Sequence, residues 1–166
     1  MSLYGVGVPA SEVQTTFQAA SAVPQLLRGT VTFVAGTTGA IAQHDVFVIT
    51  GMVKFDFYHR VLTDLTSGGA ATISYGNAGL VTALIGATTA TTHNVGDFSV
   101  PGSGTAVEAA AWGEGVGPLY HISTGADIIA NILTATITGG SIEYILLWVP
   151  LSAGATVALG SELVAS

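Results

Sequence analysis

The side chains best suited to chemistry are four histidines, and each stands in a different part of the chain. They are His44, His59, His93 and His121. Only "HD" at 44–45 and "HNVGD" at 93–97 place an imidazole close to a carboxylate, two of the ligand types from which zinc sites are built. Because no HxH or HExxH spacing occurs, we expect these residues to act as polar caps beside turns, and we predict no metal ion.

Catalytic motifs of other kinds are also missing from the sequence. It contains no GxSxG elbow, no Walker loop and no GxGxxG that opens a helix. The glycine-rich runs at 5–9 and 113–117 lack the flanking strand and helix of a phosphate loop, so we expect turns there. Glu108, Glu114 and Glu143 fall on separate predicted strands or turns, which gives no acid/base pair. We therefore predict that the protein is not an enzyme and uses no cofactor and no small-molecule substrate.

One predicted strand carries a row of polar side chains. Lys54, Asp56, Tyr58 and Arg60 occupy alternate positions and so share one face of the strand. Such a face could bind an acidic partner or a sugar. The simpler interpretation is a solvated row that keeps the strand from pairing with another chain.

The composition is unusual for a monomer in solution. Charged residues make up 8% of the 166 residues, against about 25% in average globular domains, and 49% are hydrophobic. We infer that much of the surface is buried against other subunits. The net charge is −7 and only three residues are basic, which argues against nucleic acid, whose phosphates require clustered Lys and Arg.

The sequence shows no pattern of a membrane-spanning helix or a signal peptide, and it has no cysteine. No uncharged apolar run approaches the length of a membrane-spanning helix, about 18 residues, and the N-terminus lacks the pattern of a signal peptide, so we expect no membrane partner. The chain contains no cysteine, which excludes disulfides and thiolate metal sites.

The elements that must position these side chains are predicted to be strands. Residues 1–27 show no sustained periodicity and are expected to form an extended arm. Residues 28–166 alternate Thr-, Val- and Ile-rich strands with glycine turns, which is typical of a β-sandwich. Within 30–35, Val31 and Phe33 are expected to face inward.

Further strands are expected at 44–65, at 70–76 and in short pieces within 95–123, whereas 78–92 fits a short helix and a strand equally well. In the long segment 44–65, Gly51 is expected to mark either a bulge or a close approach of a neighbouring segment. The side chains on its inward face are Phe47, Ile49, Val53, Phe55 and Phe57.

The last third of the chain is typical of a β-hairpin. Strands at 127–138 and 141–149 flank Gly139-Gly140, a pair that two-residue hairpin turns favour. This register predicts one core-facing side, made of Asn131, Leu133, Ala135, Ile137, Ile142, Tyr144, Leu146 and Trp148. The opposite side is polar near the turn and apolar far from it. We predict that its apolar residues, Ile132, Ile145, Leu147 and Val149, contact another subunit, with the alternative that residues 1–27 fold back over them.

Two stretches resemble small structural proteins of tailed bacteriophages. In "GPLYHISTGADIIANILTATITGGSIEYILLWVPLSAGATV" (117–157), a "PLY" strand leads through a Thr-rich strand and a turn to an aromatic strand and "PLS". The stretch "ISYGNAGLVTALIGATTATTHNVGDF" (73–98) is similar to the run that often precedes this pattern. Gly139-Gly140 departs from the commoner Thr-Gly-Thr turn. The resemblance implies a capsid decoration (cement) protein: a trimeric jelly-roll-like sandwich without catalysis that clamps neighbouring major capsid subunits from outside the phage head.

The predicted fold class is therefore all-β, a jelly-roll-like antiparallel β-sandwich with an extended N-terminal arm. The expected partners are further copies in a homotrimer and the major capsid protein. The expected location is the capsid exterior of the virion, after synthesis in the host cytoplasm. The alternative hypothesis is a trimeric jelly-roll binding module of a phage tail or fibre that recognises host-surface glycan. Its candidate aromatic platforms are Trp112, with Glu108 and Glu114 beside it, Tyr58 and Tyr75.

Overall fold

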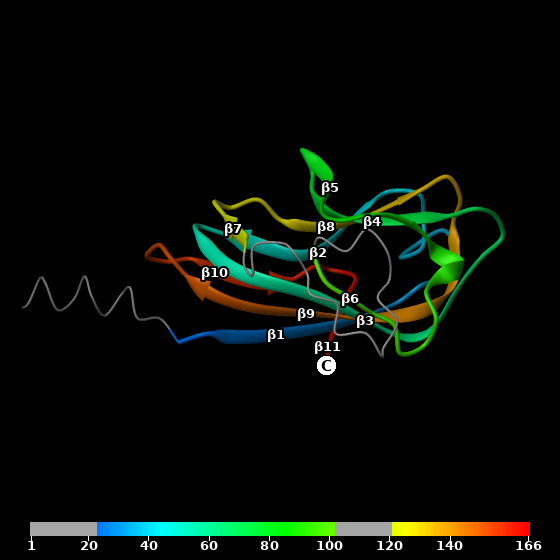
Figure 1. Cartoon of the computed structure of the whole chain (residues 1–166). Helices are drawn as coiled ribbons and strands as arrows, with labels where there is room; N and C mark the ends of the chain where they lie inside the picture. The colour runs from blue at the N-terminus through cyan, green and yellow to red at the C-terminus, as the bar shows by residue number, and fades with distance from the viewer. Residues whose placement is uncertain (1–22, 102–120) are drawn as a thin grey trace, which may run out of the picture.

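The computed structural model describes residues 23–101 and 121–166, which form two antiparallel β-sheets packed face to face (Figure 1). Sheet A has the strand order β11-β1-β9-β3-β6, with β7 also paired to β3. Its strands are β1 (Gln25–Thr32), β3 (Val53–Ser67), β6 (Phe98–Ser99), β7 (His121–Ser123), β9 (Ile137–Pro150) and β11 (Val164–Ala165). Sheet B has the order β10-β2-β8-β4-β5. Its strands are β2 (Gln43–Thr50), β4 (Thr72–Asn77), β5 (Leu80–Thr89), β8 (Ile128–Leu133) and β10 (Thr156–Leu159). The predicted all-β sandwich is confirmed.

Successive strands mostly change sheet. The chain alternates between the sheets from β1 to β4, and β8, β9 and β10 alternate again, so β9 lies between β1 and β3 while β8 lies between β2 and β4. The jelly-roll arrangement of the strands stays a prediction. Each crossing lets a strand with one apolar face bury that face between the two layers.

The N-terminal arm was predicted for residues 1–27, and residues 1–22 of it lie outside the described residues. Strand β1 begins at Gln25, within that range. Val31 and Phe33 are each 3% exposed, as the alternation in 30–35 predicts. The segment that fitted helix and strand equally well forms β5, followed by a single 3-10 turn at Ala90–Thr92. No helix in the described residues is long and apolar enough to cross a membrane.

The predicted hairpin around Gly139-Gly140 is wrong. Strand β8 pairs with β2 and β4 in sheet B, whereas β9 pairs with β1 and β3 in sheet A. The chain changes sheet near Thr134, which has a left-handed φ of 72°. Both glycines lie inside β9, where Gly140 has a φ of 101° and a Cβ atom would come within 2.8 Å of Leu65 Cα. Glycine is therefore needed at position 140 because the pairing of β9 with β3 is irregular there. A turn is not required to explain its presence.

The segment 44–65 is likewise two strands in two sheets, so the prediction of one strand region with a bulge at Gly51 is wrong. The alternative of a close approach at Gly51 is confirmed, because a Cβ atom there would lie 3.1 Å from Ala155 Cα. Gly51 has a φ of 75° and lies in the connection between β2 and β3. The inward residues were nevertheless identified correctly, because both sheets face the same core. Phe47 of β2 and Phe57 of β3 meet there with ring centroids 6.3 Å apart.

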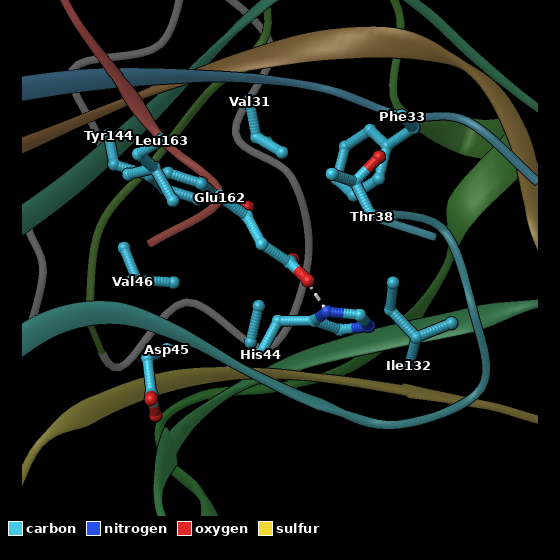
Figure 2. A pocket seen from close by; sticks show the side chains of 11 residues that line it. Val31, Phe33, Thr38, His44, Asp45, Val46, Ile132, Tyr144, Glu162 and Leu163 are labelled. Atoms are coloured by element: carbon cyan, nitrogen blue, oxygen red, sulfur yellow. Dashed lines mark hydrogen bonds and ion pairs between the residues drawn. The ribbon is translucent and has the colours of Figure 1, made fainter. Parts of the chain in front are cut away.

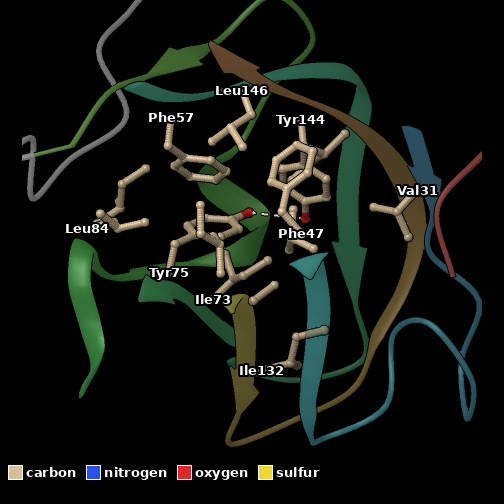
Figure 3. Packing of buried hydrophobic residues seen from close by; sticks show 14 of the residues in the cluster. Val31, Phe47, Phe57, Ile73, Tyr75, Leu84, Ile132, Tyr144 and Leu146 are labelled. Atoms are coloured by element: carbon tan, nitrogen blue, oxygen red, sulfur yellow. Dashed lines mark hydrogen bonds between the residues drawn. The ribbon is translucent and has the colours of Figure 1, made fainter. Parts of the chain in front are cut away.

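Large aromatic residues fill the centre of the sandwich (Figure 3). Phe57 lies 5.5 Å from Tyr75 and 6.2 Å from Tyr144, measured between ring centroids. The hydroxyl oxygens of Tyr75 and Tyr144 are 3.5 Å apart, which gives these buried polar groups a partner across the two sheets. Aromatic pairs of this kind contribute about 0.5–1.5 kcal/mol each beyond the area that they bury.

The C-terminal segment connects the two sheets on one side of the sandwich. Strand β10 pairs with β2 of sheet B, and β11 pairs with β1 of sheet A. Between them, the backbone N–H of Gly160 donates a hydrogen bond to the Val46 carbonyl at 2.9 Å. Leu159 and Leu163 pack against the core from this segment. Residues 156–165 thus close the side of the core next to β1 and β2.

Candidate interaction surface

The outward side of sheet A presents three neighbouring strands, β1, β9 and β3, in continuous register. Leu26, Leu147 and Asp56 form one cross-strand row, Arg28, Ile145 and Tyr58 the next, and Thr30, Glu143 and Arg60 a third. The alternate residues of β9, including Tyr144, Leu146 and Trp148, are buried in the core. Since side chains alternate along a strand, the three rows point away from the core. We call this surface, together with Val149 and Lys54 beyond the first row, the outer face of sheet A.

Three of the four predicted interface residues lie on this face. Ile145 and Val149 are half-buried, and Leu147 is 38% exposed. Leu26, its neighbour on β1, is 55% exposed and extends the apolar area. The role of these residues in subunit contact stays a prediction.

The fourth residue, Ile132, was assigned wrongly. It lies on β8 in sheet B and is completely buried in the core. The assumed hairpin placed Leu133 and Asn131 inward, whereas Ile128, Ala130 and Ile132 are the core residues of this strand. Because β8 and β9 belong to different sheets, the register of one does not fix the facing of the other.

A carboxylate between two guanidinium groups occupies the third row. Glu143 lies on the central strand, and its side chain is only 7% exposed. Its Oε2 atom is 2.9 Å from Arg60 Nη2 and its Oε1 atom 3.9 Å from Arg28 Nη1. The short distance makes Arg60 the closer ion-pair partner, although the Oε2 atom makes no well-aligned hydrogen bond. Glu108 and Glu114 lie outside the described residues, so the predicted separation of the three glutamates stays a prediction.

We expect Arg60→Ala to destabilise the fold more than Arg28→Ala. Removing Arg60 leaves a largely buried carboxylate without its close counter-ion, which should cost about 1–3 kcal/mol, between the values for exposed and buried pairs. The more distant Arg28 should contribute less than about 1 kcal/mol. Urea unfolding of both variants, each also combined with Glu143→Gln, measures the two coupling energies. Equal coupling energies would contradict the prediction.

The polar row on β3 is less solvated than predicted. Lys54, Asp56 and Tyr58 are half-buried, and only Arg60 is exposed. The Tyr58 ring stacks on Phe98 of β6, with centroids 5.6 Å apart. Burial, and secondarily the charge of Asp56, raises the pKa of the Tyr58 hydroxyl. This row therefore forms a packed part of the outer face of sheet A.

The two histidine-carboxylate segments do not form ligand clusters. His44 Nδ1 is 2.8 Å from Glu162 Oε2 (Figure 2). The Nε2 atom of His44 is 3.0 Å from the Ala40 carbonyl oxygen. The adjoining cavity, about 10 Å³, has room for one water at most. In the second segment, the Asp97 carboxylate accepts a hydrogen bond from Asn94 N–H, which is the expected turn cap. Within residues 23–101 and 121–166, no three His, Cys, Asp or Glu side chains gather as metal ligands would.

A buried histidine pair escaped the sequence analysis. His59 and His93 are 0% and 1% exposed, with ring centroids 5.7 Å apart. His93 Nε2 lies 2.7 Å from Thr88 Oγ1, but neither ring nitrogen of His59 has a hydrogen-bond partner. Burial, helped by the proximity of His93, lowers the pKa of His59 to about 3, and burial also lowers the pKa of His93. The alternating pattern of β3 could have predicted the burial of His59, because His59 follows Phe55 and Phe57 on the inward side.

The structure describes two of the three aromatic residues that the glycan hypothesis requires, Tyr75 and Tyr58. Tyr75 is completely buried, so its assignment as an exposed platform is wrong. Tyr58 is half-buried against Phe98. Trp112 lies outside the described residues. An open cavity of about 290 Å³ beside His121 is lined by both apolar and polar side chains, and among the described residues its aromatic rings are those of Phe55 and His121.

Comparison with known proteins gives similarity at the level of structure. No family model and no curated protein sequence matches the chain. A chain in the structure described as the acidic stable capsid of Helicobacter pylori bacteriophage KHP30 is similar, with a TM-score of 0.50 and 10% identity, over 82% of this chain and 94% of that one. A chain of the cyanophage Pam1 capsid asymmetric unit gives a TM-score of 0.38 and 15% identity over 90% and 92% of the two chains. The first likeness establishes a shared fold.

Proposed function

We propose that this chain is a structural virion protein, a capsid decoration (cement) protein that binds the outer surface of a phage head and clamps neighbouring major capsid subunits. The fold that it shares with a chain of a phage capsid structure supports this role. The shared region covers nearly all of that chain as well as most of this one.

The observation that carries the proposal is the outer face of sheet A. Leu26, Ile145, Leu147 and Val149 form an apolar strip on the outside of a sheet whose other side already holds the core. Covering such a strip stabilises an assembly by about 25 cal/mol per Å² before the costs of association.

In this proposal the strip is the contact between copies, which assemble as a homotrimer, and the part of the predicted arm that precedes β1 reaches the capsid. Binding and burial perform the task, so no catalytic step is required. The protein would be made in the host cytoplasm and end on the capsid exterior. The acidic balance of the chain suits that place better than contact with packaged DNA.

Leu147→Asp should reduce assembly and, with it, occupancy on capsids. Burying an unpaired carboxylate in an apolar contact is unfavourable, so we expect at least a tenfold weaker self-association. Val48→Asp is the matched control, because Val48 on sheet B is also 38% exposed. Mass measurement during size-exclusion chromatography reports the oligomer. If both variants and the wild type ran as the same monomer, the strip would not be an interface.

Binding to purified undecorated capsids tests the role itself. The wild-type chain should co-sediment with such capsids at a fixed number of copies per particle, and it should show no binding on a host-glycan array. Glycan binding without capsid binding would instead support the tail or fibre hypothesis.

A further inference from the structure

The imidazole of His44 joins three parts of the chain. His44 lies on β2, Glu162 lies in the C-terminal segment, and Ala40 lies in the connection between β1 and β2. The two ring nitrogens are 2.8 Å from Glu162 Oε2 and 3.0 Å from the Ala40 carbonyl oxygen (Figure 2). The His44 side chain is 11% exposed, so the protein itself supplies most of its surroundings.

Both neighbours of this imidazole accept hydrogen bonds. A backbone carbonyl has no proton to give, and an ionised carboxylate is an acceptor only. A neutral imidazole donates from one nitrogen and accepts at the other, whereas a protonated imidazole donates from both. The two contacts of His44 therefore require one proton more than a neutral imidazole and an ionised carboxylate hold together. With that proton in place, the bond to Glu162 joins opposite charges and is strengthened by them.

Glu162 lies in the middle of a segment whose ends are attached by short strands. Strand β10 pairs with four residues of β2, and β11 pairs with two residues of β1. Between them the Gly160 N–H donates to the Val46 carbonyl. Short pairings at the edge of a sheet open more easily than the centre of the core. The contact with His44 thus fastens the C-terminal segment between two weak attachments.

We propose that His44 and Glu162 form a proton-dependent clasp, which holds the C-terminal segment on the sandwich and loosens as the pH rises. After loss of the shared proton, a neutral imidazole donates to one neighbour only. If Nε2 keeps its hydrogen, the lone pair of Nδ1 faces the Glu162 carboxylate and repels it. If Nδ1 keeps its hydrogen, the bond to Glu162 loses the positive charge of its donor. The attachment of the segment weakens in either case, and proton loss favours the open state.

The other titratable groups beside the clasp, among the described residues, are Asp45 and Tyr144. Asp45 is exposed and points away from the imidazole (Figure 2). Burial raises the pKa of the Tyr144 hydroxyl, and the charge of Glu162 adds to the rise, so Tyr144 stays neutral where imidazoles titrate. Strands β1 and β8 contribute apolar side chains to the adjoining cavity. The proton that closes the clasp is therefore shared by His44 and Glu162.

Opening of the clasp would uncover one side of the sandwich in both sheets. Without β10 and β11, β2 becomes the edge of sheet B and β1 the edge of sheet A. Unpaired backbone groups at such edges pair readily with strands of other chains. The pH thus controls whether these two edges are covered.

Glu162→Gln tests the clasp, because it keeps the shape of the side chain but replaces one acceptor oxygen with an N–H₂ donor. A neutral imidazole then accepts from this amide at Nδ1 and donates to Ala40 from Nε2. Both contacts survive without the extra proton. Glu162→Ala, which lacks the contact at every pH, is the open reference.

Hydrogen exchange of the Gly160 and Leu163 amides in the full-length protein measures the opening, after correction for intrinsic exchange rates. Between about pH 5.5 and about pH 8.5, the protection factors of the wild type should fall about fivefold or more relative to those of Glu162→Gln. Those of Glu162→Ala should be low at both pH values. Amides in the centre of β3 report global unfolding and correct for acid destabilisation of the whole fold.

Nitrogen NMR of the His44 ring gives a second readout that mere packing would not change. At the alkaline pH, the ring in Glu162→Gln should carry its single proton on Nε2. Equal pH dependence of Gly160 protection in the wild type and Glu162→Gln would overturn the clasp. A proton on Nδ1 in that variant would overturn it as well. Because no capsid is needed, the result is independent of the proposed function.

Discussion

Replacing His59 with phenylalanine should remove a large part of the loss of stability that this protein suffers in acid. The folded chain keeps His59 neutral down to about pH 3, because the imidazole is completely buried beside Tyr75 and His93. In the unfolded chain the imidazole takes up a proton near pH 6.5. The unfolded state therefore binds more protons between these two pKa values, and stability falls as the pH drops through that window.

For one such histidine, the free energy of unfolding falls by about 1.4 kcal/mol for each pH unit within this window. The wild type should therefore lose roughly 2–3 kcal/mol of stability from His59 between pH 7.5 and 4.5. His93, whose pKa is also lowered, adds to this loss in both proteins. Urea unfolding at the two pH values measures the difference. The variant should also gain stability at pH 7.5, because two buried nitrogens without partners, each costing about 1–3 kcal/mol, are removed.

His59→Gln separates titration from polarity. Glutamine does not titrate, so the acid loss should shrink as in the phenylalanine variant, but its buried amide should give no gain at pH 7.5. An undiminished acid loss in both variants would show that protonation of His59 does not govern acid stability.

Gly160→Ala should be among the most damaging substitutions in the chain. A Cβ atom at this position would overlap the backbone carbonyl of Asp45, and backbone cannot move aside as the end of a side chain can. The hydrogen bond from Gly160 to Val46 holds the C-terminal segment at this point, so relief of the overlap requires the segment to shift away from β2. We expect a loss of about 3 kcal/mol or more, at or above the upper end for overpacked sites.

Gly68→Ala is the matched control. Nothing lies within 4 Å of a Cβ atom there, and its φ is outside the left-handed range. Alanine should therefore leave stability unchanged or raise it by up to about 1 kcal/mol through the unfolded state. Thermal unfolding of both variants gives the comparison, and a Gly160→Ala protein as stable as the control would contradict the close packing of residue 160 on Asp45.

The sequence by itself determined which side of most strands faces the core. The alternation around Val31, Phe57 and Tyr144 predicts burial that the structure confirms, because a sandwich buries one face of a strand whichever sheet the strand joins. The same alternation predicts that Leu147 is accessible on the outer face of sheet A. The all-β class followed from these patterns and from the glycine-rich connections between them.

Only the tertiary structure decided which strands pair. The sequence patterns around Gly51 and Gly140 are equally compatible with a bulge, a tight turn or a crossing between sheets, since glycine permits the positive φ that each requires. The chain changes from sheet B to sheet A near Thr134, where no glycine marks the crossing. For this reason Ile132 was placed on the wrong surface. Side-chain alternation fixes the facing of a residue within its own strand, but partner choice depends on contacts between strands far apart in the chain. The gathering of Arg28, Lys54 and Arg60 on one sheet face depends on the same long-range pairing.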